Sequence, residues 1–530
     1  MTFIKNLSLA IAATSVLVPA GQAIAEDYFD INNVGQNTED SMMQVNSVFQ
    51  LRDVAPSDWA FDALRNLVEK YNCIAGYPDG TFRGNRPLSR YEFAAGLNAC
   101  MQQIERLIVG GETPDAADIT RLRALVQEFE AELATLGARV DDIEGRVEFL
   151  EDNQFSTTTK LVGEVAFVVA DAFGEDDVNG NDLEANTVFH NKVRLQLVTS
   201  FTGKDKLYTR LTAGNTTASF STETGTNEGR FAHDTGDATN DIVIDRLHYV
   251  FPLGKKTTVT TMARLGAHHF YADTFNKGLE AGGGANGALS RFGERNPIYR
   301  LGISAPTTGI GFKHNFNDTF QLSAGYLAKN GSDPSEEAGL FDGTYSALAQ
   351  LVVKPSKKFK FGATYVRGYD TSTGTFAFGG TGTNFANGLT GIGGGGLTSN
   401  SFGLQGQFDI SPKFSLRAWG GYTDVDAIGG GEADIWNYAV AAVFPDLGKK
   451  GNMGAIIVGA EPHATELTNG AGADQLGTSD DTPWHIEGFY KYQLTKNISI
   501  TPGVIWLTSP NQDSGNDDIV IGALRTTFKF

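Results

Sequence analysis

Polar connections of two lengths alternate along residues 160–530. Short turns rich in Asn, Asp or basic residues occur at 203–206, 254–256, 315–318, 355–358, 411–413, 446–451 and 495–497. Long polar stretches lie between them, at 170–187, 216–241, 268–308, 329–345, 370–400, 424–435, 461–483 and 509–518. Eight long and seven short connections separate sixteen segments of alternating character, as expected of strands that bury one face. The pattern predicts sixteen antiparallel strands with both ends of the sheet on the short-turn side.

The last of these segments, 519–530, ends on an aromatic residue. Its alternate positions Val520, Leu524 and Phe528 suit lipid, whereas Arg525 and Lys529 on the other face suit water. The apolar content of 41% without a run of about 18 apolar residues excludes a helical membrane protein. The segment resembles the terminal strand of bacterial outer-membrane β-barrels. In those proteins the assembly machinery recognises the terminal strand. We therefore expect an all-β transmembrane barrel over 160–530, in contact with outer-membrane lipid.

Residues 1–25 have the pattern of a secretory signal. Lys5 precedes an apolar core at 7–17, and the small residues Ala23 and Ala25 mark a cleavage site, so the mature chain is expected to begin near Glu26. Cys73 and Cys100 are the two cysteines of the chain. In an exported protein they could form a disulfide, and the alternative is a pair of buried thiols.

The stretch 47–110 is predicted to form a small α-helical domain. Ser57 or Asp58 can cap a helix over 59–71, and Ser89 can cap a second helix over 90–107. The motifs Asp53-Val54 and Trp59-Ala60, the run GYPDGTF at 76–82 and the run SRYEF at 89–93 resemble an S-layer homology (SLH) domain. The family's final motif reads TRAEF, so this chain departs from it at two positions but keeps the arginine and the glutamate.

The resemblance implies that the domain binds pyruvylated polysaccharide attached to peptidoglycan. Arg90 would pair with the polymer's carboxylate, because a guanidinium fork matches a planar anion. The neighbouring candidates are Trp59, Asp58 and Glu92, although Trp59 could equally be a core aromatic. The family often uses three such domains in tandem, and with one domain the affinity would depend on several chains held together.

Ten apolar residues follow one another at steps of three and four in the segment 115–153: Ile119, Leu122, Val126, Phe129, Leu133, Leu136, Val140, Ile143, Val147 and Leu150. This heptad pattern predicts a coiled coil of about 48 Å, a periplasmic spacer. The alternative is one amphipathic helix packed on a globular domain. The core residues favour a dimer, whereas the resemblance to porins favours a homotrimer, and we expect the homotrimer. We interpret the excess of acidic side chains in this segment as a solvated surface of the helix.

Single basic residues stand inside several strand segments. An arginine that faces the bilayer midplane costs about 2–4 kcal/mol, whereas one that faces a watery lumen costs little. We therefore predict that the following residues line the pore: Arg194, Arg210, Arg246, Arg264, Arg367, Arg417, Lys491 and Arg525. The lumen would then be basic and favour anions or planar hydroxyl-bearing solutes. Alternatively, several of these residues lie near the rims or neutralise Glu164, Asp409 and Glu487.

The third long connection, 268–308, is the longest. In the general porins, which this barrel resembles, the third loop folds into the barrel and narrows it. The loop would then place Arg291, Glu294, Arg295 and Arg300 at a constriction, although a plain surface loop is the alternative. No arrangement of residues suggests an enzyme, a metal site, a cofactor or nucleic-acid binding.

The order of signal, SLH domain, coiled coil and barrel is similar to the SLH-domain porins of cyanobacterial outer membranes. Their barrel belongs to the carbohydrate-selective porin family, and some members are described as iron uptake porins. The resemblance implies passive diffusion of small hydrophilic solutes, such as sugars, inorganic ions and iron, with the N-terminal region in the periplasm. The residues themselves offer no selective iron site. The alternatives are a cell-wall tether with little channel activity and a secreted adhesin.

Overall fold

The computed structural model describes residues 46–58, 61–74, 80–84 and 158–530 except 236–237, 281–283 and 303–306, with isolated helical positions between 96 and 107 and at 142 and 144. The chain divides into two compact units, 1–152 and 153–530. Among these described residues, none of the helices has the length and apolar character needed to span a bilayer.

The first unit has a small apolar core. The short helical elements η2 (Val48–Gln50), α1 (Phe61–Arg65) and the π-helical turn η3 (Asn66–Lys70) surround Val48, Leu64 and Val68. The helix predicted over 59–71 is thus helical from Phe61 to Lys70. Of the predicted helix over 90–107, the described positions are helical. The predicted coiled coil lies outside the described residues except for two helical positions.

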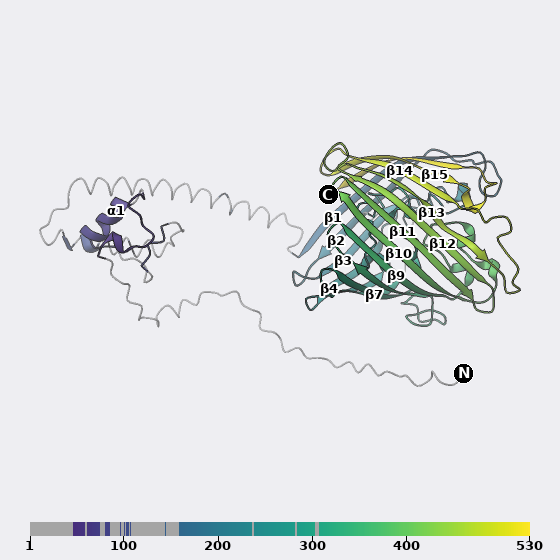
Figure 1. Ribbon diagram of the computed structural model, residues 1–530, viewed down its shortest axis with the longest axis horizontal. Coiled ribbons are helices and arrows are strands. Elements are labelled where there is room, and N and C mark those ends of the chain that lie inside the picture. Colours follow the sequence, from purple (N-terminus) through teal and green to yellow (C-terminus); the bar gives the residue numbers. More distant parts are fainter. Residues whose placement is uncertain are drawn as a thin grey trace, which may run out of the picture. The chain divides into compact units, whose positions relative to one another are not determined.

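The second unit is a closed antiparallel barrel in which every strand pairs with its neighbours in chain order and the first strand pairs with the last (Figure 1). The sixteen strands of the described residues confirm the predicted fold class. Their bounds are β1 (Thr159–Phe173), β2 (Val188–Thr199), β3 (Lys206–Gly214), β4 (Val243–Leu253), β5 (Thr257–Arg264), β6 (Thr308–Asn315), β7 (Phe320–Ala328), β8 (Tyr345–Val353), β9 (Phe359–Asp370), β10 (Leu397–Ser411), β11 (Phe414–Ala427), β12 (Glu432–Pro445), β13 (Met453–Leu467), β14 (Trp484–Gln493), β15 (Ile498–Thr508) and β16 (Ile519–Lys529).

The long connections, here called L1 to L8, lie at one end of the barrel and the short turns at the other. L1 to L8 comprise residues 174–187, 215–242, 265–307, 329–344, 371–396, 428–431, 468–483 and 509–518. Short helical elements occur in four of them: α4 (Ser221–Thr224) in L2; η4 (His268–Phe270), α5 (Arg291–Glu294) and η5 (Pro297–Arg300) in L3; η6 (Thr373–Thr375), η7 (Asn384–Ala386) and η8 (Thr390–Ile392) in L5; and η9 (Pro510–Gln512) in L8.

L6 is shorter than the predicted stretch 424–435. The hairpin pairing of β11 and β12 continues through Asp424 opposite Asp434 and ends at Asp426 opposite Glu432. These acidic residues suggested a loop, but they are strand residues that face outward beyond the apolar part of the wall. Polarity alone therefore placed the end of the strands too early.

Aromatic side chains mark both ends of the outward-facing surface. Near the long loops, the rings of Tyr365 and Phe402 lie 5.2 Å apart and those of Tyr422 and Trp436 lie 4.8 Å apart. Near the short turns, Phe359 packs against its neighbours on β9 and β10. Exposed aliphatic residues such as Leu404, Val440 and Ile456 lie between the two rows. An apolar band flanked by aromatic girdles fits the hydrocarbon layer and interfaces of a bilayer.

The seam between β1 and β16 closes the barrel. Gly163 and Phe530 exchange two backbone hydrogen bonds, of 2.7 and 3.1 Å. The ring of Phe530 occupies the space that a side chain on Gly163 would fill. The glycine therefore allows an aromatic ring to cover the seam, as aromatic residues do beside glycines in designed sheets.

We predict that Gly163→Val weakens this seam. The added side chain overlaps the Phe530 ring, and overpacking of this kind costs about 1–3 kcal/mol. The temperature at which the purified barrel loses its compact, SDS-resistant form on a gel should fall. Gly488→Val on β14 is the matched control, because a Cβ there meets no atom within 4 Å. Equal behaviour of the two variants would contradict the role of the ring.

Candidate pore constriction

L3 lies inside the barrel. Its apolar residues Leu279, Leu289 and Phe292 belong to one buried cluster with inward-facing wall residues, among them Trp419 on β11, whose ring lies 5.6 Å from that of Phe292. The loop's short helical elements are locally capped. The Ser290 side chain accepts a hydrogen bond from Gly293 N at the start of α5, and Asn296 accepts one from Ile298 N ahead of η5.

Two charged wall residues hold L3 against the last strands. Glu487 on β14 accepts hydrogen bonds from the backbone amides of Leu289 and Ser290, at 2.6 and 3.1 Å. Arg525 on β16 donates to the carbonyl oxygens of Gly284 and Ala288, both at 3.0 Å, and to that of Gly287. Charged partners make such hydrogen bonds strong, so this side of the loop is firmly attached.

The opposite side of L3 is held by polar groups on β8 and β9. Ser346 donates to the carbonyl oxygen of Leu301 at 2.9 Å, and Gln350 donates to that of Asp273 at 2.8 Å. The hydroxyl of Tyr299 donates to the same Asp273 oxygen at 3.0 Å and lies 3.2 Å from the Thr364 hydroxyl. L3 is therefore fixed to two separate parts of the wall and crosses the lumen between them.

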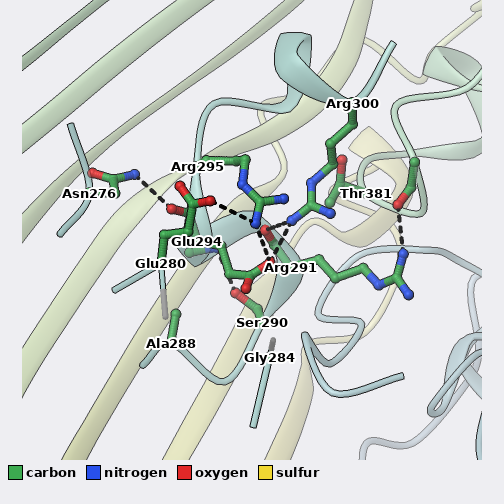
Figure 2. Close-up of polar contacts among 12 residues, drawn as sticks. Asn276, Glu280, Gly284, Ala288, Ser290, Arg291, Glu294, Arg295, Arg300 and Thr381 are labelled. Atoms are coloured by element: carbon green, nitrogen blue, oxygen red, sulfur yellow. Dashed lines mark hydrogen bonds and ion pairs between the residues drawn. The ribbon is translucent and has the colours of Figure 1, made fainter. Parts of the chain in front are cut away.

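The four predicted constriction residues lie together on L3 (Figure 2). Glu294 Oε2 lies 3.2 Å from Arg295 and 2.9 Å from Arg300, and Arg295 also lies 3.2 Å from Glu280. Burial opposes ionisation of Glu294, but the two arginines outweigh it and lower its pKa. Arg291 donates to the Gly379 carbonyl of L5 at 2.9 Å. The cluster holds three arginines against two carboxylates and is positive overall.

A second arginine group faces inward from β2, β3 and β4. Arg210 lies 2.6 Å and Arg194 lies 3.5 Å from Asp245. The pairing of β3 with β4 shifts between Ile244 and Arg246, which leaves Asp245 as an extra, bulged residue. Both Asp245 and Arg246 are thereby directed to the arginine group. The Arg246 guanidinium lies 4.2 Å from the ring centroids of both Tyr208 and Phe270. Phe270 belongs to L3, so this group meets the loop.

Two predicted lining residues are covered by the loop. Arg525 is fully buried under L3, and Arg417 on β11 is buried and donates to the Lys277 carbonyl at 2.9 Å. Both face inward as expected, but they attach L3 instead of lining open space. The prediction that they line the pore is corrected accordingly. Lys491 on β14 faces inward and is half-buried, and Arg264 is half-buried at the end of β5.

The prediction that Arg367 lines the pore is wrong. Side chains alternate along β9, and Arg367 shares a face with Tyr365, which is 37% exposed on the outer wall. Arg367 donates to Asn400 Oδ1 at 3.0 Å, and Asn400 donates to Asp424 at 3.3 Å. This outward polar chain adjoins the aromatic row near the long loops, where a long side chain reaches water at little cost.

Sequence reasoning missed one inward wall residue that holds two loops, and one buried carboxylate within a loop. Glu461 on β13 accepts hydrogen bonds from Gly229 N of L2 at 2.9 Å and from Gly382 N of L5 at 2.8 Å, and it lies 2.8 Å from His485 Nδ1. In L2, burial and the nearby Glu461 charge raise the pKa of Glu228 to about 7. The sequence analysis placed Glu461 at the start of the polar connection 461–483, but β13 continues to Leu467, so the inward position of Glu461 depends on a strand end that polarity did not indicate. Within the described residues, no group of three or more His, Cys, Asp or Glu could hold a metal ion.

Most of the predicted wall-polymer site lies outside the described residues: Trp59, Arg90 and Glu92. Asp58 is exposed, and its side chain accepts a hydrogen bond from Ala55 N at 2.7 Å ahead of α1. Asp53 accepts hydrogen bonds from the amides of Phe82 and Arg83 and thus holds the end of the GYPDGTF segment. Cys73 and Cys100 form a disulfide.

Comparisons with known proteins match both units. The family described as "Carbohydrate-selective porin, OprB family" matches residues 116–530, and the S-layer homology domain matches residues 50–94. An uncharacterised protein of Nostoc sp. is 44% identical and aligns over 97% of this chain and 91% of its own length. An uncharacterised protein of Synechocystis sp. is 39% identical over the full length of both chains. Among solved structures, OprB of Pseudomonas putida is 12% identical, covers 73% of this chain and 97% of its own, and has a TM-score of 0.48.

We predict that Arg525→Gln loosens L3. Three backbone carbonyls lose a charged donor, and hydrogen bonds to charged groups contribute about 1.5–3 kcal/mol each. Single-channel recordings should show larger conductance with frequent current fluctuations. Lys491→Gln is the control, since it removes an inward charge from the neighbouring part of the wall without a recorded contact to L3 among the described residues. A quiet, unchanged channel in the Arg525 variant would contradict the attachment.

Proposed function

Because the chain belongs to the carbohydrate-selective porin family, we propose that its barrel is a passive pore for small hydrophilic solutes with a preference for anions. The protein is an outer-membrane porin, a channel and not an enzyme. The observation that carries the proposal is the position of L3 inside the closed barrel, fixed to two parts of the wall. A loop held in this way narrows the route that a solute can take.

Charge at the narrowed part supports the anion preference. Arg291, Arg295 and Arg300 stand on the loop, and the arginine group of β2 to β4 stands on the wall beside Phe270. The carboxylates within ion-pair distance of these arginines are Glu280, Glu294 and Asp245, and Asp234 and Glu164 act on Arg291 and Arg194 from farther away. Arginines outnumber carboxylates, so the local potential attracts anions although the whole chain has a formal charge of −20. Planar guanidinium groups also suit the hydroxyl groups of sugars.

The N-terminal unit supports a second role. An SLH domain precedes the barrel, and such a domain implies binding to cell-wall polysaccharide. We propose that the protein tethers the outer membrane to peptidoglycan, with Arg90 pairing with a pyruvyl carboxylate and segment 115–153 serving as a coiled-coil spacer in the periplasm. The homotrimer expected from the resemblance to porins belongs to the same proposal, and so does transport of sugars, inorganic ions and iron.

We predict anion selectivity that depends on the wall arginines. Reversal potentials across planar bilayers in a salt gradient should favour chloride, and Arg246→Gln should reduce the permeability ratio about two- to threefold by removing one unit of lumen charge. Arg367→Gln, on the outer wall, should leave the ratio unchanged. Cation selectivity in the wild type would overturn the anion preference. Folded protein that forms no channels would favour the second candidate function, a tether with little conductance.

We predict that Arg90→Ala reduces sedimentation of the purified protein with peptidoglycan sacculi that retain their attached polysaccharide. A carboxylate would lose its fork-shaped donor, and the bound fraction should fall by about tenfold at limiting sacculi. Channel conductance should remain unchanged, because the barrel is a separate compact unit. Sacculi treated to remove the polysaccharide provide the control. Undiminished binding of the variant would remove Arg90 from the proposed site.

A further inference from the structure

A recess of about 420 Å³ lies between L3 and the inner wall of the barrel. Two of its lining residues come from the wall: Lys313, near the end of β6, and Lys360, the second residue of β9. Both positions adjoin short turns, so the recess lies on the short-turn side of the constriction. The loop supplies Asp273, Asn276, Lys277 and Glu280.

The two carboxylates of the recess are already paired. Lys360 Nζ donates to both carboxylate oxygens of Asp273 at 3.1 Å, and Asp273 also accepts a hydrogen bond from Phe275 N. Glu280 lies 3.2 Å from Arg295, which reaches it from the constriction cluster. Each carboxylate of the recess therefore already shares its charge with a cation.

Two further lysines have no ion pair of their own among the described residues. Asp273 acts electrostatically on Lys313, but its carboxylate is already paired with Lys360. Lys313 faces inward beside Gly311, and among the described residues no hydrogen bond or ion pair is recorded for its ammonium group. Lys277 is exposed, and its backbone contacts Arg417 through the carbonyl oxygen and Glu280 through an isolated β-bridge. The nearby Lys354 donates to Gln321 and adds a third positive charge at this end of the wall. The recess thus has an excess of positive charge.

The remaining lining residues are neutral: Ala272, Thr274 and Asn276. The Thr274 hydroxyl donates to Glu280 and the Asn276 amide donates to the Glu294 carbonyl, so each residue keeps its side-chain oxygen as an acceptor. The paired Asp273 offers acceptor oxygens beside them. A volume of this size lies in the range of small-molecule sites. Unpaired ammonium groups next to mixed donors and acceptors suit a solute that has both an oxyanion and several hydroxyls.

We propose that this recess is a subsite for phosphorylated monosaccharides, which dwell there after passing the constriction. The inference rests on the proposed function, since a solute reaches the recess through the pore. Lys313 would bind the phosphate, with Lys277 beside it. The loop's hydroxyl and amide groups would contact the sugar. A neutral sugar would lack the charged contact and bind more weakly.

The test is block of chloride current through the full-length protein in planar bilayers, with glucose 6-phosphate and glucose as probes. Glucose 6-phosphate should reduce the current at a lower concentration than glucose. Lys313→Met should raise the half-blocking concentration about tenfold, the effect of losing one hydrogen bond to a charged group. Lys313→Arg should retain block, which separates loss of charge from misfolding. Lys357→Met, in the short turn 354–358 at the same end of the barrel, is the matched control and should behave as the wild type.

Equal half-block in the wild type and Lys313→Met would overturn the inference, and so would loss of block confined to Arg246→Gln, which would place the anion at the constriction. Open wild-type channels that glucose 6-phosphate blocks no better than glucose would overturn the subsite and leave the pore intact. Folded wild-type protein without channels would overturn the proposed function together with the subsite.

Discussion

A backbone amide or carbonyl that meets hydrocarbon without a partner costs several kcal/mol, and a sheet that spans a bilayer must therefore have no free edge. In this protein that requirement is met at the β1–β16 seam, where Gly163 and Phe530 exchange hydrogen bonds and the Phe530 ring covers the glycine. Closure fixes which face of each strand is lipid-facing and which is inward-facing. The inward charges face the lumen because the sheet is closed.

A closed barrel of sixteen strands is too wide for side chains of the wall alone to fill. Here the interior is occupied by L2, L3 and L5, and their apolar residues pack with wall residues in two buried clusters. Charged wall groups then fix the backbones of these loops: Glu461 holds L2 and L5, and Glu487 and Arg525 hold L3. Some of the inward charges therefore hold the loops that shape the route of a solute, and these charges do not face the solute directly.

Strand number, strand order and most connections could be predicted, because short turns have a clear chemical signature and alternation is local. L6 was misplaced because Asp424 and Asp434 are polar residues in strands that extend past the apolar band. The outward direction of Arg367 depends on where β9 begins, and the inward direction of Asp245 depends on a β-bulge. Neither the start of the strand nor the bulge can be predicted from composition. The arginines of L3 were found, but their pairing with Glu280 and Glu294 depends on a tertiary arrangement that spacing does not encode.

The position of Arg525 also constrains the order of assembly. It lies on the last strand in chain order, yet it binds carbonyl groups of a loop that begins after the fifth strand. The loop's attachment on this side cannot be complete until the final strand has been added and the sheet has closed. Maturation of the pore is therefore coupled to completion of the wall, and an unfinished barrel lacks the narrow passage of the finished one.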